Sequence, residues 1–195
     1  KAYDDIVMQL DSVQKNLLDK TTGLLYHARD ESKEQAWANK ETGLSTNFWG
    51  RAMGWYGMAM VDVLDYLPQN HPGRARIISY IKSYSDAIIK YQDKKSGLWY
   101  QVLDKPLANG NYEEATASAM FVYTMIKSVN KGYLPKSYKA AAKKGYDGII
   151  KNLITVDENG VVNLNKCCAV AGLGGKPYRD GSYEYYVNEE IRSND

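Results

Sequence analysis

The chain has 195 residues, of which 25 are basic and 23 acidic, so its formal net charge at pH 7 is +2. This balance disfavours nucleic acid and anionic membranes as partners, because both select strongly basic surfaces. Hydrophobic residues make up 44% of the chain and charged residues 25%, a composition that excludes a disordered or fibrous protein. A chain of this length can bury a sizeable core.

The aromatic residues are unusual in kind, because 17 are Tyr, four are Trp and only two are Phe. Tyr and Trp carry a polar group on an apolar ring and therefore suit surfaces that are both apolar and wet. A cleft that binds sugar is such a surface, so the composition favours a carbohydrate ligand.

The ends of the sequence and its few ligating residues limit the function further. Lys1 stands in front of a segment that already has helical periodicity, which predicts that the natural start lies upstream; a cytoplasmic and a periplasmic location both remain open. The two cysteines, Cys167 and Cys168, are adjacent, a spacing at which a disulfide is strained. With only His27 and His71 besides, we expect no zinc site, no other metal and no cofactor.

Five segments show the apolar spacing of helices. The first, third and fifth have one apolar stripe, as in Ile77, Ile81 and Ile88, and so predict outer helices. The second and fourth are apolar on nearly every side and predict helices enclosed by other protein. In chain order the predicted helices cover residues 4–19, 51–67, 73–92, 113–130 and 136–154.

A glycine turn and a short β-prone run follow each outer helix, at Gly23, Gly97 and Gly160. This repeat of helical hairpins predicts an all-α fold, an α/α toroid with short β-hairpins between helices. Five helices are too few to close such a ring, so we expect residues 1–195 to form a single partial domain, or else an open solenoid. Exposed helix flanks would then favour an oligomer or a missing companion half of the barrel.

The first candidate site lies at the start of the second predicted helix. Arg51 and Trp55 are four residues apart and share a helix face, and Trp49 stands at the N-terminus. Arginine can grip a carboxylate with two hydrogen bonds, and indole rings cover the apolar faces of a sugar, so the three residues suit an acidic sugar. The alternative is structural: core tryptophans and an internal ion pair of Arg51.

A second group, around His27 and Asp30, occupies the loop after the first glycine turn. A histidine beside carboxylates can move protons or bind hydroxyl groups. Solvated or capping carboxylates are the alternative. His71, beside Pro72, is expected to be a surface turn residue.

A long glycine-rich loop precedes Tyr183, but it lacks the Gly-Lys-Ser/Thr sequence and the strand-to-helix context of a nucleotide-binding loop. We expect it to cap the cleft, with Arg179, Ser182 and Tyr183 touching the substrate; the alternative is an ion pair between Arg179 and Asp180. The acidic pair Glu113 and Glu114 is explained by capping of the fourth helix.

Four segments together resemble one known family. They are residues 27–32 (His-Ala-Arg-Asp-Glu-Ser), 49–56 (Trp-Gly-Arg-Ala-Met-Gly-Trp-Tyr), 97–102 (Gly-Leu-Trp-Tyr-Gln-Val) and 171–186 (Ala-Gly-Leu-Gly-Gly-Lys-Pro-Tyr-Arg-Asp-Gly-Ser-Tyr-Glu-Tyr-Tyr). The combination resembles glycoside hydrolase family 105, the unsaturated rhamnogalacturonyl hydrolases, which are related to the unsaturated glucuronyl hydrolases of family 88. The resemblance implies a bacterial enzyme of pectin degradation with an (α/α)6 barrel, of which this chain matches the C-terminal half.

The resemblance also implies a reaction. Members of the family hydrate the C4=C5 double bond of a terminal uronic acid and so release it from an oligosaccharide. Trp49, Arg51 and Trp55 match substrate-subsite positions, and His27 matches an active-site histidine. The family's general acid lies in a Trp-x-Asp segment that this sequence lacks and that is expected upstream of Lys1. Asp30 is at best a local substitute, so we expect the chain alone to be inactive.

Two other classes of function remain open at this point. One is a helical-repeat interaction module that binds a protein or polysaccharide without chemistry. The other is a different α/α-toroid enzyme that acts on carbohydrate, such as a polysaccharide lyase.

Overall fold

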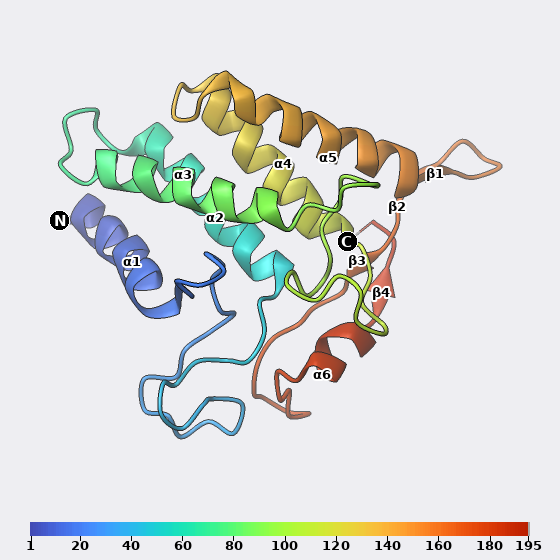
Figure 1. Ribbon diagram of the computed structural model, residues 1–195, viewed down its shortest axis with the longest axis horizontal. Helices are drawn as coiled ribbons and strands as arrows, with labels where there is room; N and C mark the ends of the chain where they lie inside the picture. Colours follow the sequence, from blue (N-terminus) through green and yellow to red (C-terminus); the bar gives the residue numbers. More distant parts are fainter. Residues whose placement is uncertain (195) are drawn as a thin grey trace.

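A computed structural model describes residues 1–194 as a set of helices joined by long loops (Figure 1). The longer helices are α1 (Ala2–Leu17), α2 (Gly50–Tyr66), α3 (Arg74–Lys90), α4 (Ala115–Asn130) and α5 (Lys139–Asn152). The shorter elements are the 3-10 helix η1 (Lys136–Tyr138), the helix α6 (Tyr183–Asn188) and the strands β1 (Ile154–Val156), β2 (Val162–Leu164), β3 (Cys167–Cys168) and β4 (Ile191–Arg192). All five predicted helices are present.

Helices α2 and α4 pack side by side as the inner layer. Their close approach needs Gly54, because a Cβ atom there would lie 2.6 Å from the sulfur of Met120. Met53, Met60 and Phe121 are almost completely buried in the main core between the helices. Burial of apolar surface on nearly all sides explains why these two sequences lack a broad polar face.

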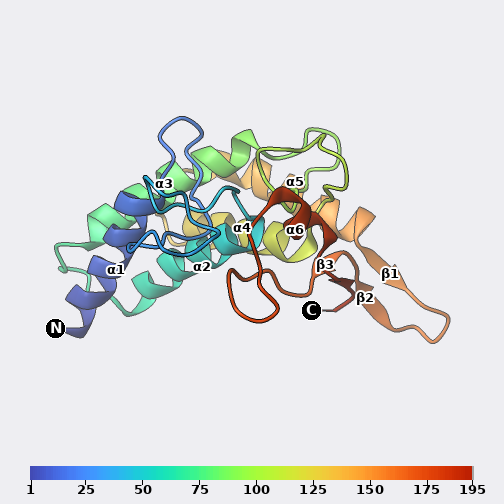
Figure 2. The same ribbon diagram turned by 90° about the horizontal axis from the view of Figure 1, so that it is seen from below.

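The one-faced helices α3 and α5 cover the inner pair from one side (Figure 2). The Tyr84 hydroxyl of α3 donates to the carbonyl of Met53 in α2 at 2.8 Å. Helix α1 lies at the edge, where its Asp11 receives two hydrogen bonds from the Arg76 guanidinium of α3. The outer and inner helices therefore alternate along the chain as predicted.

The predicted strand pairs form to different extents. After α5, β1 and β2 make an antiparallel hairpin in which Ile154 pairs with Leu164. At the two earlier turns only single bridges form, Leu18 with Leu25 and Tyr100 with Glu113. The chain is thus mostly helical with short β-hairpins, as the sequence predicts.

One stripe of the inner layer is open to solvent. Trp55 and Tyr66 of α2 are 58% and 76% exposed, and Tyr123 of α4 is 39% exposed. The prediction that inner helices are enclosed on every side therefore fails for this stripe. Within residues 1–194, no helix has the length and apolar character needed to span a membrane. Both cysteines are free and buried.

Candidate functional site

The long loops and α6 gather at the N-terminal ends of α2 and α4, along the lower side of Figure 1. They bring together a second, smaller core whose members come from segments far apart in the sequence. Its buried residues are Trp49, Val102, Cys168, Ala171 and Tyr186. Three of the four motif segments, residues 49–56, 97–102 and 171–186, therefore meet in one region.

Two hydrogen bonds in series, through the side chain of Gln101, fix the position of the Trp49 side chain. It is the N-cap residue of α2 and is 7% exposed. Its indole nitrogen donates to the side-chain oxygen of Gln101 at 3.0 Å, and the Gln101 amide nitrogen donates to the carbonyl of Tyr186 at 3.0 Å. Gln101 is completely buried, and its two hydrogen bonds connect α6 to the start of α2.

His27 packs against both of these aromatic residues. Its ring centroid lies 4.7 Å from that of Trp49, and its Nδ1 lies 2.6 Å from the Tyr186 hydroxyl. Burial lowers the pKa of His27 from 6.5 to about 4, because the charged imidazolium loses its hydration. Burial likewise raises the pKa of Tyr186. Both groups are therefore neutral at physiological pH.

Arg51 forms an internal ion pair, which the sequence left open as the alternative to binding an acidic sugar. Its Nη2 lies 3.1 Å from the Glu114 carboxylate and also donates to the Thr116 hydroxyl and the Cys168 carbonyl. Nη1 donates to the carbonyl of Ala169 at 3.3 Å, whereas the buried Nε has no partner among the described residues. Most of the guanidinium is thus occupied by protein, and its role toward a substrate carboxylate stays a prediction.

Trp55 differs from Trp49 in its surroundings. It lies one turn beyond Arg51 in α2, and more than half of its side chain is exposed. A core role does not apply to it. An exposed indole on a rigid helix is suited to stacking against the apolar face of a sugar ring.

The contacts of Asp30 do not support a role as proton donor. Its carboxylate accepts hydrogen bonds from the backbone of Gln35 at 2.8 Å and from the Ser32 hydroxyl at 2.7 Å. These bonds, the Gln35 one first, lower the pKa of Asp30. A general acid needs the opposite shift, so the geometry favours the turn-holding alternative.

The glycine-rich loop uses its three predicted residues for internal contacts. Arg179 donates from Nε to the carbonyl of Gly174 at 3.0 Å; within residues 1–194 no ion pair joins it to Asp180. Ser182 is the N-cap residue of α6, and the Tyr183 hydroxyl donates to the Asn109 carbonyl at 2.9 Å. Contact of these residues with a substrate stays a prediction.

Sequence reasoning missed several residues that build the site. Gln101 lies inside a quoted motif, and its polar side chain between Tyr100 and Val102 was the available signal. Asn47 precedes the Trp49 cluster and donates to the carbonyl of Gly181 at 2.8 Å, which anchors the loop over the site. The capping role expected of Glu114 is confirmed, since its carboxylate accepts from the backbone of Ala117. The ion pair between Glu114 and Arg51 could not be predicted from the spacing of the two residues in the sequence.

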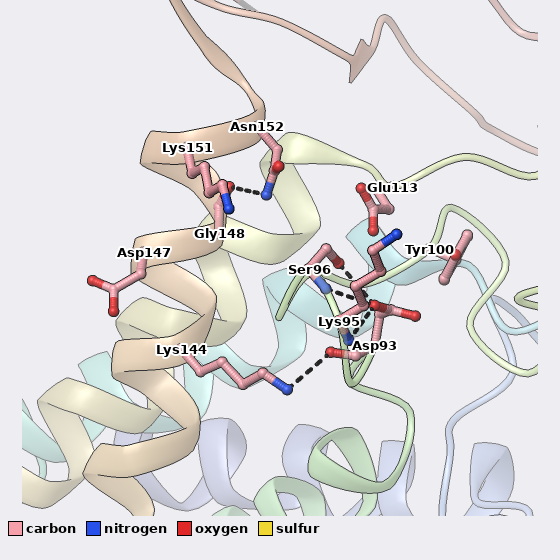
Figure 3. Close-up of a pocket in the computed structure, with 10 residues that line it drawn as sticks. All are labelled: Asp93, Lys95, Ser96, Tyr100, Glu113, Lys144, Asp147, Gly148, Lys151 and Asn152. Atoms are coloured by element: carbon pink, nitrogen blue, oxygen red, sulfur yellow. Dashed lines mark hydrogen bonds between the residues drawn. The ribbon is translucent and has the colours of Figure 1, made fainter.

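A separate pocket of about 510 Å³ lies between α5 and the turn after α3 (Figure 3). Lys144 reaches across it to the carbonyl of Asp93, whose carboxylate accepts from the backbone of Lys95 and Ser96. Tyr100 lines this pocket, whereas its neighbour Gln101 points the other way, toward Trp49. The pocket therefore lies outside the aromatic site.

The fold and the site place the chain in a class. Two inner helices bordered by outer ones, with an aromatic cluster at the inner N-termini, define an α/α-toroid protein. The model of Glycosyl Hydrolase Family 88 matches residues 1–195, and the chain belongs to that family, in the group of families 88 and 105 that the motifs predicted.

Known proteins agree with this assignment. The chain is 38% identical over 179 residues to Protein Atu3128 of Agrobacterium fabrum, covering 89% of this chain and 76% of that protein. It is 32% identical over 141 residues to the unsaturated rhamnogalacturonyl hydrolase YesR of Bacillus subtilis, covering 71% of this chain and 38% of YesR.

A solved structure gives the same result. A family 105 glycoside hydrolase of C. acetobutylicum ATCC 824 superposes with a TM-score of 0.97 and 52% identity. The match covers 100% of this chain and 54% of that one, so the chain spans about half the length of this relative.

Proposed function

We propose that this chain forms the substrate-binding end of an enzyme that removes a C4=C5 unsaturated uronic acid from pectin-derived oligosaccharides by hydrating the double bond. Membership of family 88 and the identity to YesR support the proposal. The single observation that carries it is the exposed Trp55 on the helix that also bears Arg51 and that has Trp49, packed against His27, at its N-terminus.

The contacts suggest how an unsaturated uronate would be held. The exposed indole of Trp55 offers a flat apolar surface to the sugar ring, and the carbon–carbon double bond flattens the part of the ring that stacks. The Arg51 guanidinium has five N–H donors, and its Nη1 has one protein acceptor, the Ala169 carbonyl, so Nη1 keeps a second N–H for a carboxylate. His27 is neutral, so it adds a polar group to the site without adding charge.

Hydration of a vinyl ether needs a proton donor. A carboxylic acid gives a proton to C4, a water molecule adds to C5 through its oxygen and returns one proton to the carboxylate, and the resulting hemiketal opens to release the rest of the sugar chain. Among the described residues around the site, Glu114 accepts hydrogen bonds from Arg51, Cys168 and Ala117, and Asp30 is held as a carboxylate. We therefore assign binding, and not protonation, to this chain.

The test is to incubate the purified chain with unsaturated rhamnogalacturonan disaccharide. The ultraviolet absorbance of the double bond follows turnover, and calorimetry follows binding in the same buffer. The expected result is heat of binding with unchanged absorbance, while a longer protein that contains this chain consumes the double bond. Rapid loss of absorbance with the chain alone would contradict the division of roles.

A binding module without chemistry is the second candidate. The exposed indole of Trp55 favours it, because such a surface can bind a sugar ring whether or not a reaction follows. It predicts that the longer protein also binds the disaccharide without consuming the double bond.

A further inference from the structure

His27 and Tyr186 lie 159 residues apart in sequence and meet through one short hydrogen bond. The Nδ1 atom of His27 and the Tyr186 hydroxyl are separated by 2.6 Å. The Tyr186 side chain is completely buried, and its ring centroid lies 5.8 Å from the imidazole and 6.1 Å from Trp49. A hydroxyl so enclosed has little freedom to choose another partner.

The donor in this hydrogen bond can be identified by counting the protons that each group carries. A phenol has one O–H donor, and a neutral imidazole has one N–H and one bare nitrogen. Within residues 1–194, His27 is the only hydrogen-bond partner of the Tyr186 hydroxyl. If Nδ1 carried the proton and donated it, the buried phenol proton would have no acceptor, which is unfavourable for an enclosed donor. If the phenol donates, both atoms are satisfied.

We infer that Tyr186 is a positioning residue whose hydroxyl donates to Nδ1 of His27 and so holds the imidazole in the tautomer protonated at Nε2. Nε2 has no hydrogen-bond partner among the described residues. It is not one of their buried polar atoms that lack a partner, so it is exposed to solvent. The imidazole also borders a small pocket of about 170 Å³ between the ends of α1 and α2. His27 therefore presents an N–H donor to the site and no basic nitrogen.

This assignment restricts what His27 can do. An N–H donor binds an acceptor oxygen, such as a uronate carboxylate or a sugar hydroxyl, but it cannot take a proton from water. His27 would then orient the ligand in place of activating the attacking water. The ligand named here rests on the proposed function, whereas the tautomer does not.

The tautomer can be read directly by nuclear magnetic resonance. The chain has only two histidines, so a His71→Gln background leaves His27 as the single imidazole. Two-bond correlations between ring protons and nitrogen-15 distinguish a protonated Nε2 from a protonated Nδ1. At neutral pH we expect the Nε2–H pattern alone. An Nδ1–H pattern in this otherwise unchanged chain would overturn the inference without any further variant.

Tyr186→Phe tests the positioning role because it keeps the ring and removes the hydroxyl. We expect a mixture of both tautomers, whereas an unchanged Nε2–H pattern would overturn the role. Tyr178→Phe is the matched control: it removes a hydroxyl from the glycine-rich loop that contacts the backbone of Trp37 and not His27.

Adding unsaturated rhamnogalacturonan disaccharide to the His71→Gln chain separates the two proposals. A shift of the His27 Nε2 resonance supports its role as the ligand donor. A constant resonance would contradict the binding role of His27 in the proposed function and leave the tautomer assignment standing.

Discussion

Arg51 and Glu114 form an ion pair that joins the N-termini of the two inner helices. Arg51 Nη2 lies 3.1 Å from Glu114 Oε1, and the Glu114 side chain is completely buried. The same carboxylate caps α4 and accepts from the backbone of Cys168 at 2.8 Å. Glu114 therefore connects α2, α4 and the loop that leads to α6. These three segments support the aromatic site.

The first prediction concerns Glu114→Gln. The change leaves the Arg51 charge buried without its counter-charge, and removal of one partner of a buried pair costs about 3–5 kcal/mol. We expect the free energy of unfolding, measured by urea denaturation, to fall by about 3 kcal/mol. Glu113→Gln is the neighbouring control, with an expected change below about 0.5 kcal/mol. Equal effects of the two variants would contradict the central role of Glu114.

The two tryptophans of the site should respond differently to truncation. Trp49 is buried and hydrogen-bonded to Gln101, so Trp49→Ala should lower the free energy of unfolding by about 3–5 kcal/mol. Trp55 is 58% exposed, so Trp55→Ala should change it by less than about 1 kcal/mol. Calorimetric titration should show at least a tenfold weaker affinity of Trp55→Ala for the unsaturated disaccharide. Full affinity in this variant would remove Trp55 from the site.

Burial of His27 predicts a pH dependence of stability. Above pH 6.5 the imidazole is neutral in the folded and the unfolded chain. Between pH 6.5 and about 4 only the unfolded chain takes up the proton, so the folded state loses stability as the pH falls, and below about 4 the loss is complete. A pKa lowered from 6.5 to about 4 corresponds to about 3 kcal/mol.

The measurement is urea denaturation of the parent chain and His27→Gln at several pH values. The difference between them should be constant above pH 6.5 and should shrink by about 3 kcal/mol down to pH 4. A difference independent of pH would show that His27 is not buried as a neutral group.

The helices were predictable because their periodicity is local. The expected ranges 51–67 and 73–92 differ by one or two residues at each end from α2 (Gly50–Tyr66) and α3 (Arg74–Lys90). Helix α6 was missed because its six residues are too few to establish a period. The sequence predicts a substrate contact for Ser182, which in the structure is the N-cap residue of this helix.

The clustering of several candidate residues was predictable, but their pairings were not. Trp49, Arg51 and His27 stand out as residue types, and the structure brings them into one region. Their partners come from distant segments: Glu114 lies 63 residues from Arg51, and Tyr186 lies 159 from His27. Such contacts are set by how the helices pack and leave no trace in the local spacing.

The central claim is that the aromatic cluster at the start of α2 binds the unsaturated uronate. The four tryptophan indole N–H groups report on this claim in a single nitrogen-15 correlation spectrum, recorded during titration with unsaturated rhamnogalacturonan disaccharide. Trp99 serves as internal control, because it is completely buried and donates to the carbonyl of Ile88 at 2.7 Å. The account predicts that the Trp49 and Trp55 resonances shift while Trp99 stays in place. Constant Trp49 and Trp55 resonances at saturating disaccharide would contradict it.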